Sequence, residues 1–323
     1  MNILLEVLKS IFPIFAIILI GYLLQNSHWF DDSFAGNISK LIMKIALPAS
    51  VFTSVISHLT ASRLASFADG LLIGGTAVLI SYLAAFVLAK IIKVKRGRRG
   101  TFINTFANAN TIFIGMPLNL ALFGAAAETY FLIYYVINTV STWAFGSFLI
   151  TGDPLEENRT TKKSSRKGAW KQILSPPLIA FLLAIILVLL NVQVPAPITT
   201  TTQYLGNLVT PLALIYIGIV LCNAGLKSLR FDKDTVVALI GKFVIAPAAM
   251  ILVIQIVIHT GYNMPSAEQS TLIMQSAVPA LTVLPVLANE GKGDVHYATS
   301  IVALSTILFA VVAPIIMMVI QAL

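Results

Sequence analysis

The sequence has little of what soluble enzymes and nucleic-acid-binding proteins use for their chemistry. One of its 323 residues is cysteine, and only 11% are charged. The single thiol, Cys222, allows no internal disulfide and no thiolate cluster, and it reads as a small buried apolar residue. The four histidines show no metal-ligand spacing, and no nucleophile elbow, zinc-protease motif, phosphate loop or dinucleotide fingerprint is present. These absences predict a protein that is not an enzyme and uses no cofactor or metal.

Acidic residues are missing from the centres of the hydrophobic runs. All 13 Asp and Glu residues lie in predicted loops or near predicted helix ends. Cation pumps and proton relays usually keep a carboxylate inside the membrane, because such a charge is costly there and is retained for function. The pattern therefore disfavours a cation antiporter.

Long apolar runs dominate the sequence, in which 58% of the residues are hydrophobic. A hydrocarbon core about 30 Å thick needs roughly 20 mostly apolar residues per helix. The dyad alternation of a strand barrel is not seen. The fold class predicted is an all-α membrane protein with ten transmembrane helices. Their approximate ranges are 11–24, 41–56, 70–88, 102–123, 131–150, 178–190, 204–221, 236–258, 272–287 and 301–320.

The positions of the basic residues predict the orientation in the membrane. The formal net charge is +8, and lysine and arginine are concentrated at 90–99 and 159–171, in two loops that fall on one side. Positive loops mark the cytoplasmic face. We therefore expect a multi-pass protein of the cell (plasma) membrane with both termini extracytoplasmic. The loops lack interleaved aromatic residues, which argues against a nucleic-acid partner.

Matched prolines predict an internal repeat. Pro48 and Pro211 lie in the second helix of each half, and Pro117 and Pro279 lie in the fourth. Because each half has an odd number of helices, the second half enters the membrane from the opposite side, and the repeat is inverted, as in many secondary transporters. Chance matching is the alternative, since prolines are common in membrane helices. The predicted organisation is a first five-helix repeat, a cytoplasmic basic loop and a second five-helix repeat, at 1–151, 152–175 and 176–323.

The predicted binding site lies where the fourth and ninth helices are interrupted. Gly115 and Pro117 are expected to break the fourth helix, which is unusually polar over 104–119, and Pro279 to break the ninth. If the two breaks meet at the bilayer midplane, two helix N-termini, each with about half a positive charge, favour an anion. Alternatively, the amides only join helices, at roughly 0.6–2 kcal/mol each. The residues predicted to bind substrate are Asn108, Asn110, Thr111, Gly115, Met116, Pro117, Gln275, Ser276, Pro279, Ala280, Thr282, Lys44 and Pro48.

Two lysines, Lys44 and Lys242, fall inside predicted spans, near the cytoplasmic ends. In the alternative interpretation, each lysine extends its ammonium to the membrane interface. If Lys44 faces the cavity instead, it adds positive charge beside the helix ends, which suits an anionic substrate.

Several short motifs together resemble a known family. They are Ile45-Ala46-Leu47-Pro48-Ala49, the segment Asn110-Thr111-Ile112-Phe113-Ile114-Gly115-Met116-Pro117, Pro176-Pro177-Leu178-Ile179-Ala180, Pro211-Leu212-Ala213-Leu214 with Gly218, and Ser305-Thr306 with Pro314. In order and spacing they resemble the auxin efflux carrier family, which includes bacterial malate and malonate permeases. The resemblance implies two inverted five-helix repeats whose broken fourth and ninth helices cross at their prolines. It also implies transport of organic anions, with Asn110, residues 115–117 and Pro279 as substrate contacts.

The expected function is therefore a secondary transporter that carries small auxin-like or dicarboxylate anions by alternating access. Its expected partners are the organic anion and membrane lipid, and the sequence leaves a homodimer open. One alternative is a sodium- or proton-coupled symporter of similar fold. Another is a membrane receptor that binds a ligand without moving it, against which the short cytoplasmic loop without a signalling domain argues.

Overall fold

The computed structural model describes residues 2–31, 33–58, 64–124, 127–155, 176–225, 229 and 231–323. Every regular element in these residues is a helix. The predicted basic loop at 152–175 lies outside the described residues from 156 onward.

Six helical segments of the described residues are long and apolar enough to cross a membrane, which makes the chain an all-helical membrane protein. The predicted number of ten stays a prediction, although the shorter apolar helices Phe15–Asn26 and Ile179–Leu189 coincide with two further predicted spans. The six are Phe34–Ser57, Phe67–Ile91, Arg99–Phe123, Ala196–Asn223, Lys233–His259 and Val295–Ala322.

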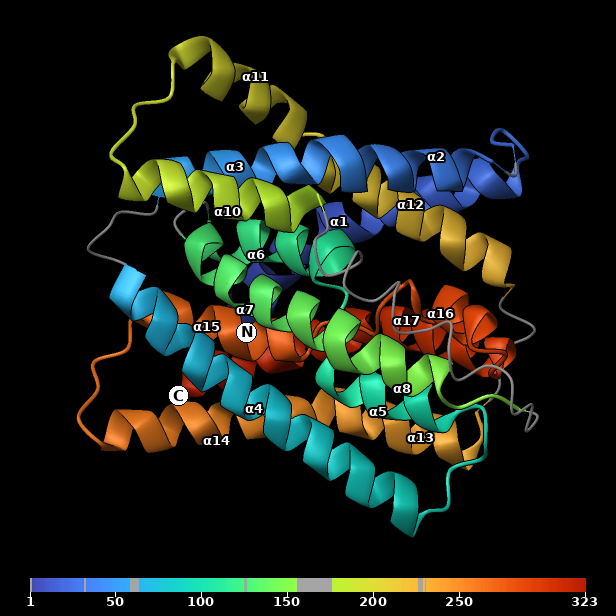
Figure 1. Cartoon of the computed structure of the whole chain (residues 1–323). Helices are drawn as coiled ribbons and strands as arrows, with labels where there is room; N and C mark the ends of the chain where they lie inside the picture. Colours follow the sequence, from blue (N-terminus) through green and yellow to red (C-terminus); the bar gives the residue numbers. More distant parts are fainter. Residues whose placement is uncertain are drawn as a thin grey trace.

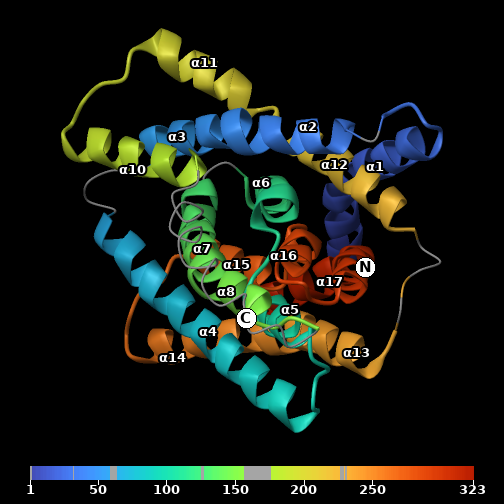
Figure 2. The same ribbon diagram turned by 45° about the vertical axis from the view of Figure 1, so that its right-hand side comes forward.

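One set of helices, called here the first helix group, lies mostly in the upper part of Figures 1 and 2, with the start of α1 running down toward the middle of the view. Within it α1 packs along α12, and α10 packs along α3. Gly21 and Gly218 allow the first of these contacts, because a Cβ atom on either glycine would overlap the backbone of the facing helix. The group consists of α1 (Asn2–Asn26), α2 (Phe34–Leu41), the π-helical turn η1 (Ile42–Ala46), α3 (Leu47–His58), α10 (Pro176–Leu189), α11 (Ala196–Gly206) and α12 (Val209–Ala224).

The remaining helices form the second helix group. Here α4 packs against α5, α7 and α14, while α15 contacts α7, α14 and α17. Helices α4, α13 and α14 lie on the side away from the first helix group (Figure 1). The group consists of α4 (Leu64–Ile91), α5 (Arg99–Ala107), η3 (Thr111–Gly115), α6 (Met116–Phe123), α7 (Glu128–Ser141), η5 (Thr142–Gly146), α8 (Ser147–Thr151), α13 (Lys233–Ile240), η8 (Gly241–Ile245), α14 (Ala246–His259), α15 (Ser266–Ser276), α16 (Leu284–Glu290) and α17 (Val295–Ala322).

Two helical segments of this group are interrupted. Between α15 and α16 the chain is not helical over 277–283, around Pro279, as the sequence predicts. Between α5 and η3 it is not helical over 108–110, which corrects the prediction that Gly115 and Pro117 mark the break. Asn108 is extended, with φ −110° and ψ 154°, and Asn110 caps the next turn. Asparagine favours such local bonds over continued helix, which explains the position of the break.

Proline has a different effect at Pro117. The π-helical turn η3 ends two residues before it, and the helix then continues as α6. The same arrangement precedes Pro48, after η1, and Pro247, after η8. Proline has no N–H to donate to a backbone carbonyl of the preceding turn. A wider π-helical turn accommodates this lost hydrogen bond, so the helix continues past the proline.

Candidate functional site

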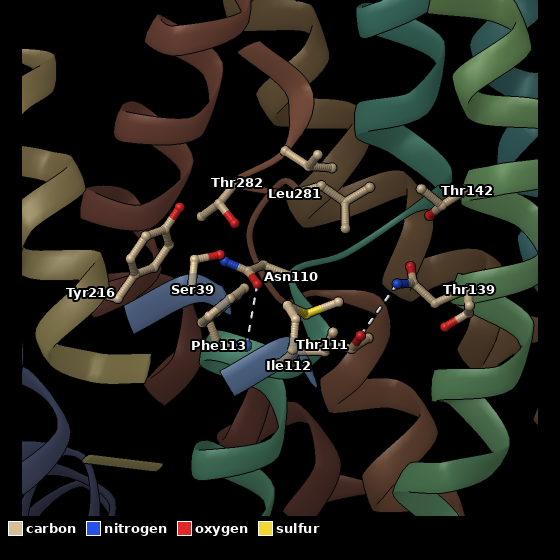
Figure 3. A pocket seen from close by; sticks show the side chains of 13 residues that line it. Ser39, Asn110, Thr111, Ile112, Phe113, Thr139, Thr142, Tyr216, Leu281 and Thr282 are labelled. Atoms are coloured by element: carbon tan, nitrogen blue, oxygen red, sulfur yellow. Dashed lines mark hydrogen bonds between the residues drawn. The ribbon is translucent and has the colours of Figure 1, made fainter. Parts of the chain in front are cut away.

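A cavity of about 210 Å³ lies between the two helix groups, beside both interruptions (Figure 3). Its walls come from α2 and η1, from α12, from the start of η3, from α7 and η5, and from the segment before α16. Amide, hydroxyl and apolar groups line it, and its described lining contains no charged side chain. The lining residues are Ser39, Met43, Asn110, Thr111, Ile112, Phe113, Asn138, Thr139, Thr142, Tyr216, Leu281, Thr282 and Val283.

Asn110 joins the two interruptions at the cavity wall. Its backbone N–H donates to the Pro279 carbonyl over 2.8 Å, so the interrupted segments are in direct contact. Its side-chain oxygen accepts from the Phe113 N–H at 3.3 Å, an N-cap on η3. The side-chain nitrogen Nδ2 is buried and has no hydrogen-bond partner among the described residues. A buried donor without a partner is costly, and this one belongs to a residue that lines the cavity.

Asn138 on α7 holds the non-helical backbone from the other side. Its Oδ1 accepts from the Ala109 N–H at 2.8 Å, and its Nδ2 donates to the Ala109 carbonyl at 3.0 Å and to Thr111 Oγ1 at 3.3 Å. The side-chain amide thus supplies the bonds that Ala109 would make in a helix. Asn138 is not among the residues that the sequence predicts. The available signal was an uncharged amide in the middle of an apolar span, which membrane proteins keep for hydrogen bonding.

Asn108 was predicted to bind substrate, but its polar atoms are engaged within the protein. Its Nδ2 donates to Tyr82 Oη at 2.6 Å, and its Oδ1 accepts from the Ser141 hydroxyl. Its carbonyl accepts from Lys242 Nζ at 3.0 Å. Asn108 therefore fixes the end of α5 and does not line the cavity described above.

Gly115 and Gln275, also predicted site residues, form a contact between the two interrupted segments. Gln275 Nε2 donates to the Gly115 carbonyl at 2.9 Å. A Cβ atom at position 115 would overlap the side-chain oxygen of Gln275, so glycine is needed here for close approach. Both residues are buried.

Two other predicted residues of the ninth helix, Ser276 and Ala280, are also hydrogen-bonded within the protein. Ser276 donates its hydroxyl to the Ile273 carbonyl at 2.6 Å, which holds the last turn of α15. Ala280 N–H donates to Ser305 Oγ of α17 at 3.2 Å, which ties the interruption to the last helix. Thr282 lines the cavity.

The structure brings Asn110, Thr111 and Thr282 to the cavity and leaves other predicted residues away from it. Met116 and Pro117 are buried at the start of α6, beyond the lining. Lys44 and Pro48 follow the cavity-lining part of their helix, and Lys44 is exposed while Pro48 is half-buried. From this helix the lining residues are Ser39 and Met43.

Tyr216 and Phe113 close one side of the cavity, with ring centroids 4.9 Å apart. They belong to different helix groups, since Tyr216 is on α12 and Phe113 is on η3. This pair is a contact that must change if the groups move relative to one another.

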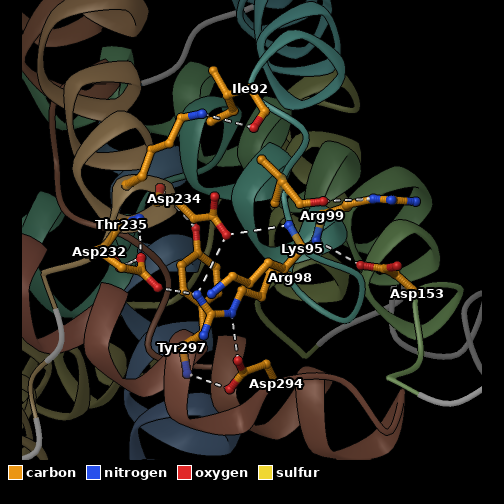
Figure 4. Close-up of polar contacts among 12 residues, drawn as sticks. Ile92, Lys95, Arg98, Arg99, Asp153, Asp232, Asp234, Thr235, Asp294 and Tyr297 are labelled. Carbon is orange, nitrogen blue, oxygen red and sulfur yellow. Dashed lines mark hydrogen bonds and ion pairs between the residues drawn. The ribbon is translucent and has the colours of Figure 1, made fainter.

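Away from the cavity, Arg98 joins the loops at the predicted cytoplasmic end (Figure 4). Its guanidinium pairs with Asp232, with Asp294 at 2.6 Å and with Asp234 at 3.6 Å, and it lies 4.8 Å from the Tyr297 ring centroid. Burial by itself would lower the pKa of Arg98, but its bonds to Asp232 and Asp294 raise it above the usual value. These contacts connect the start of α5 to the starts of α13 and α17.

The pKa of Asp232 is also shifted by these contacts. Its burial would raise its pKa, but hydrogen bonds from Thr235 and Arg98 outweigh burial and hold the pKa below the ordinary value. Asp232 also caps α13, because its Oδ1 accepts from the Thr235 N–H at 3.0 Å.

The fold and the cavity define a class of protein. Interrupted helices that meet beside a polar cavity inside a helical membrane bundle are a construction of membrane transporters. The family model described as "Membrane transport protein" matches residues 6–317. The chain therefore belongs to this family of membrane transport proteins, the auxin efflux carrier family whose motifs the sequence carries.

Curated relatives agree with the family. An uncharacterized transporter of Methanocaldococcus jannaschii is 24% identical over 90% of this chain and 91% of its own length. An uncharacterized transporter of Methanothermobacter thermautotrophicus is 24% identical over 95% of this chain and 96% of its own length. The uncharacterized transporter YfdV of Escherichia coli is 24% identical over 94% of this chain and 95% of its own length. These names indicate a transporter and not an enzyme.

Proposed function

We propose that the protein is a secondary transporter that carries a small organic anion, auxin-like or a dicarboxylate, through the cell (plasma) membrane by alternating access. The substrate binds in the cavity beside the two interruptions. The observation that carries the proposal is the buried, unpartnered Nδ2 of Asn110 in the wall of this cavity. A carboxylate oxygen of the substrate accepts that N–H, with hydroxyl groups such as those of Thr111 and Thr282 around it.

The charge distribution around the cavity supports an anionic substrate. No carboxylate is among the described lining residues. The first turn of η3 lies in the wall, and η3 runs directly into α6, so a helical segment from Thr111 to Phe123 has its N-terminus there. A helix N-terminus carries a partial positive charge, although here the N–H groups of Thr111 and Phe113 already donate to the Ala109 carbonyl and the Asn110 side chain. A volume of about 210 Å³ is below the range of roughly 300–1,000 Å³ for drug-sized ligands, which favours a small substrate.

The proposed architecture is ten transmembrane helices in two inverted five-helix repeats, with the fourth and ninth helices crossing at their interruptions. The bond between Asn110 and Pro279 supports the crossing. Reciprocal packing supports the inverted repeat: α1, the first predicted helix, packs on α12 of the seventh, and α10, the sixth, packs on α3 of the second. The Arg98 cluster joins loops at the end that we assign to the cytoplasm.

Alternating access requires one part of the molecule to move against another. Here the cavity lies at the boundary between the helix groups, with Ser39 and Tyr216 from the first and both interruptions from the second. Movement of the second helix group against the first, as a rocking or elevator-like motion, would open this cavity to one face and then to the other.

The test uses purified protein and a panel of mono- and dicarboxylates. A carboxylate that binds the folded form raises the Tm by mass action. Flux of the carboxylate with the largest Tm shift is then measured in liposomes. Asn110→Ala removes a hydrogen bond to a charged group, worth about 1.5–3 kcal/mol, and should weaken binding roughly 10- to 100-fold.

Asn119→Ala is the matched control. Asn119 is a buried amide on α6 that donates to the Ala127 carbonyl at 3.2 Å, away from the cavity. The Asn119→Ala substitution should reduce the stability of the protein but leave its affinity for the carboxylate unchanged. Equal affinity in wild type and Asn110→Ala would remove Asn110 from the binding site. A panel in which no carboxylate binds or crosses the membrane would refute the anion carrier.

A further inference from the structure

Lys242 is a completely buried lysine inside the second helix group. Its exposed fraction is 0%, and it lies in η8, the π-helical turn of the predicted eighth transmembrane helix. Its Nζ donates to the Asn108 carbonyl at 3.0 Å. Among the described residues, no carboxylate forms an ion pair with Lys242. A lysine in such a place is costly and is retained for function.

The carbonyl that Lys242 binds belongs to a helix end. Helix α5 stops at Ala107, and Asn108 is its C-cap. The last carbonyls of a helix have no partner within the helix and carry a partial negative charge. In secondary transporters, such half-helix C-termini and unwound carbonyls are where coupling cations bind. The Lys242 ammonium binds one carbonyl of this kind.

The other groups at this end of α5 are neutral. Asn108 engages Tyr82 and Ser141 through its side chain. Asn104, one turn earlier on α5, is buried, and neither polar atom of its side chain has a partner among the described residues. The contact that Lys242 makes at this helix end is therefore with the Asn108 carbonyl.

We propose that Lys242 is a built-in cation that takes the place of a coupling sodium ion, so that this carrier works without sodium. This proposal deepens the proposed function, on which it rests for the role in transport. Because the ammonium is covalently attached, the C-terminus of α5 needs no ion from solution. It also holds the Asn108–Asn110 interruption in the shape that presents Asn110 to the cavity.

The first experiment measures the Tm of the wild-type protein against sodium chloride, with choline chloride keeping the ionic strength constant. No carboxylate is needed, so the result is independent of whether the anion carrier proposal holds. We expect the Tm to be unchanged by sodium. A sodium-specific rise of about 3 °C or more would show a native sodium site and would overturn the proposal.

The second experiment compares variants of Lys242. Lys242→Ala removes the ammonium and leaves room for an ion, and it should lower the Tm by about 5 °C or more and make the Tm rise with sodium. Lys242→Met fills the space without charge, so it should lose stability without the sodium response. A Lys242→Ala protein whose Tm does not rise with sodium, whatever that Tm is, would also overturn the proposal. If neither variant can be purified, the wild-type titration still decides.

Lys233→Ala is the matched control. Lys233 also donates to a backbone carbonyl, that of Ile92 at 3.2 Å, but it is exposed at the start of α13. Its substitution should change neither the Tm nor its sodium dependence. In liposomes, flux of the carboxylate identified by the panel should be equal with sodium or choline for wild type and Lys233→Ala, and at least about tenfold lower for Lys242→Met.

Discussion

Replacing Asn138 with leucine tests how the interruption between α5 and η3 is held in place. Leucine has a similar size but can make none of the three hydrogen bonds of the amide, two to Ala109 and one to Thr111. Ala109 is 0% exposed, so its N–H and carbonyl would lose their partners where water does not replace them. Each such group costs about 1–3 kcal/mol, or about 2–6 kcal/mol together. The corresponding fall in Tm is about 3–9 °C, because a chain of this length loses about 1.5 °C per kcal/mol.

The assay is thermal unfolding of the purified variant in detergent, followed by carboxylate binding at a temperature where it is folded. Binding should weaken as well, because Asn110 and Thr111 directly follow the released Ala109. Val140→Ala is the control, since Val140 is 40% exposed on the same helix and should change the Tm little. An Asn138→Leu protein within about 2 °C of wild type would refute the reasoning that this amide stabilises the interruption.

Three further predictions concern contacts away from Asn138. Arg98→Met leaves the carboxylates of Asp232 and Asp294 close together without their cation and should destabilise the fold by about 3–5 kcal/mol, measured by thermal unfolding with Arg98→Lys as the milder comparison. Because the pKa of Asp232 is lower in the folded state, its stabilising effect is present above its unfolded pKa and is lost as the pH falls. Wild-type Tm should therefore fall between about pH 5 and pH 3 more steeply than that of Asp232→Asn, and parallel curves would contradict this. Gly115→Ala should displace Gln275, break its bond to the backbone and cost about 1–3 kcal/mol, and an unchanged Tm would contradict the close contact.

The sequence predicted the break in the ninth helix better than the break in the fourth. Pro279 lies within a non-helical segment, whereas Pro117 lies in a helix that continues past it. A proline is tolerated in the first turn of a helix or after a π turn, so proline alone does not locate a break. The actual break at 108–110 is fixed by bonds to Asn138 and Pro279, which are distant in the sequence.

Only some of the residues that line the cavity could be predicted from the sequence. Asn110 and Thr111 could be predicted, because polar residues beside a helix break are unusual in a membrane span. Ser39 and Tyr216 could not be predicted as lining residues, since neither lies beside a helix break. They become lining residues only because α2 and α12 pack against the second helix group at that point.

By itself, the sequence determined that the chain is a helical membrane protein of a transporter family, because bilayer thickness dictates the length of apolar runs and the family motifs are local. Only the tertiary structure decided which polar groups face the cavity and which charge is buried. Lys44 and Lys242 look alike in the sequence, each within an apolar span, yet one is exposed and the other is 0% exposed against the end of α5. The physical reason is that the solvation of a side chain depends on which neighbouring helix covers it, and that is set by long-range packing.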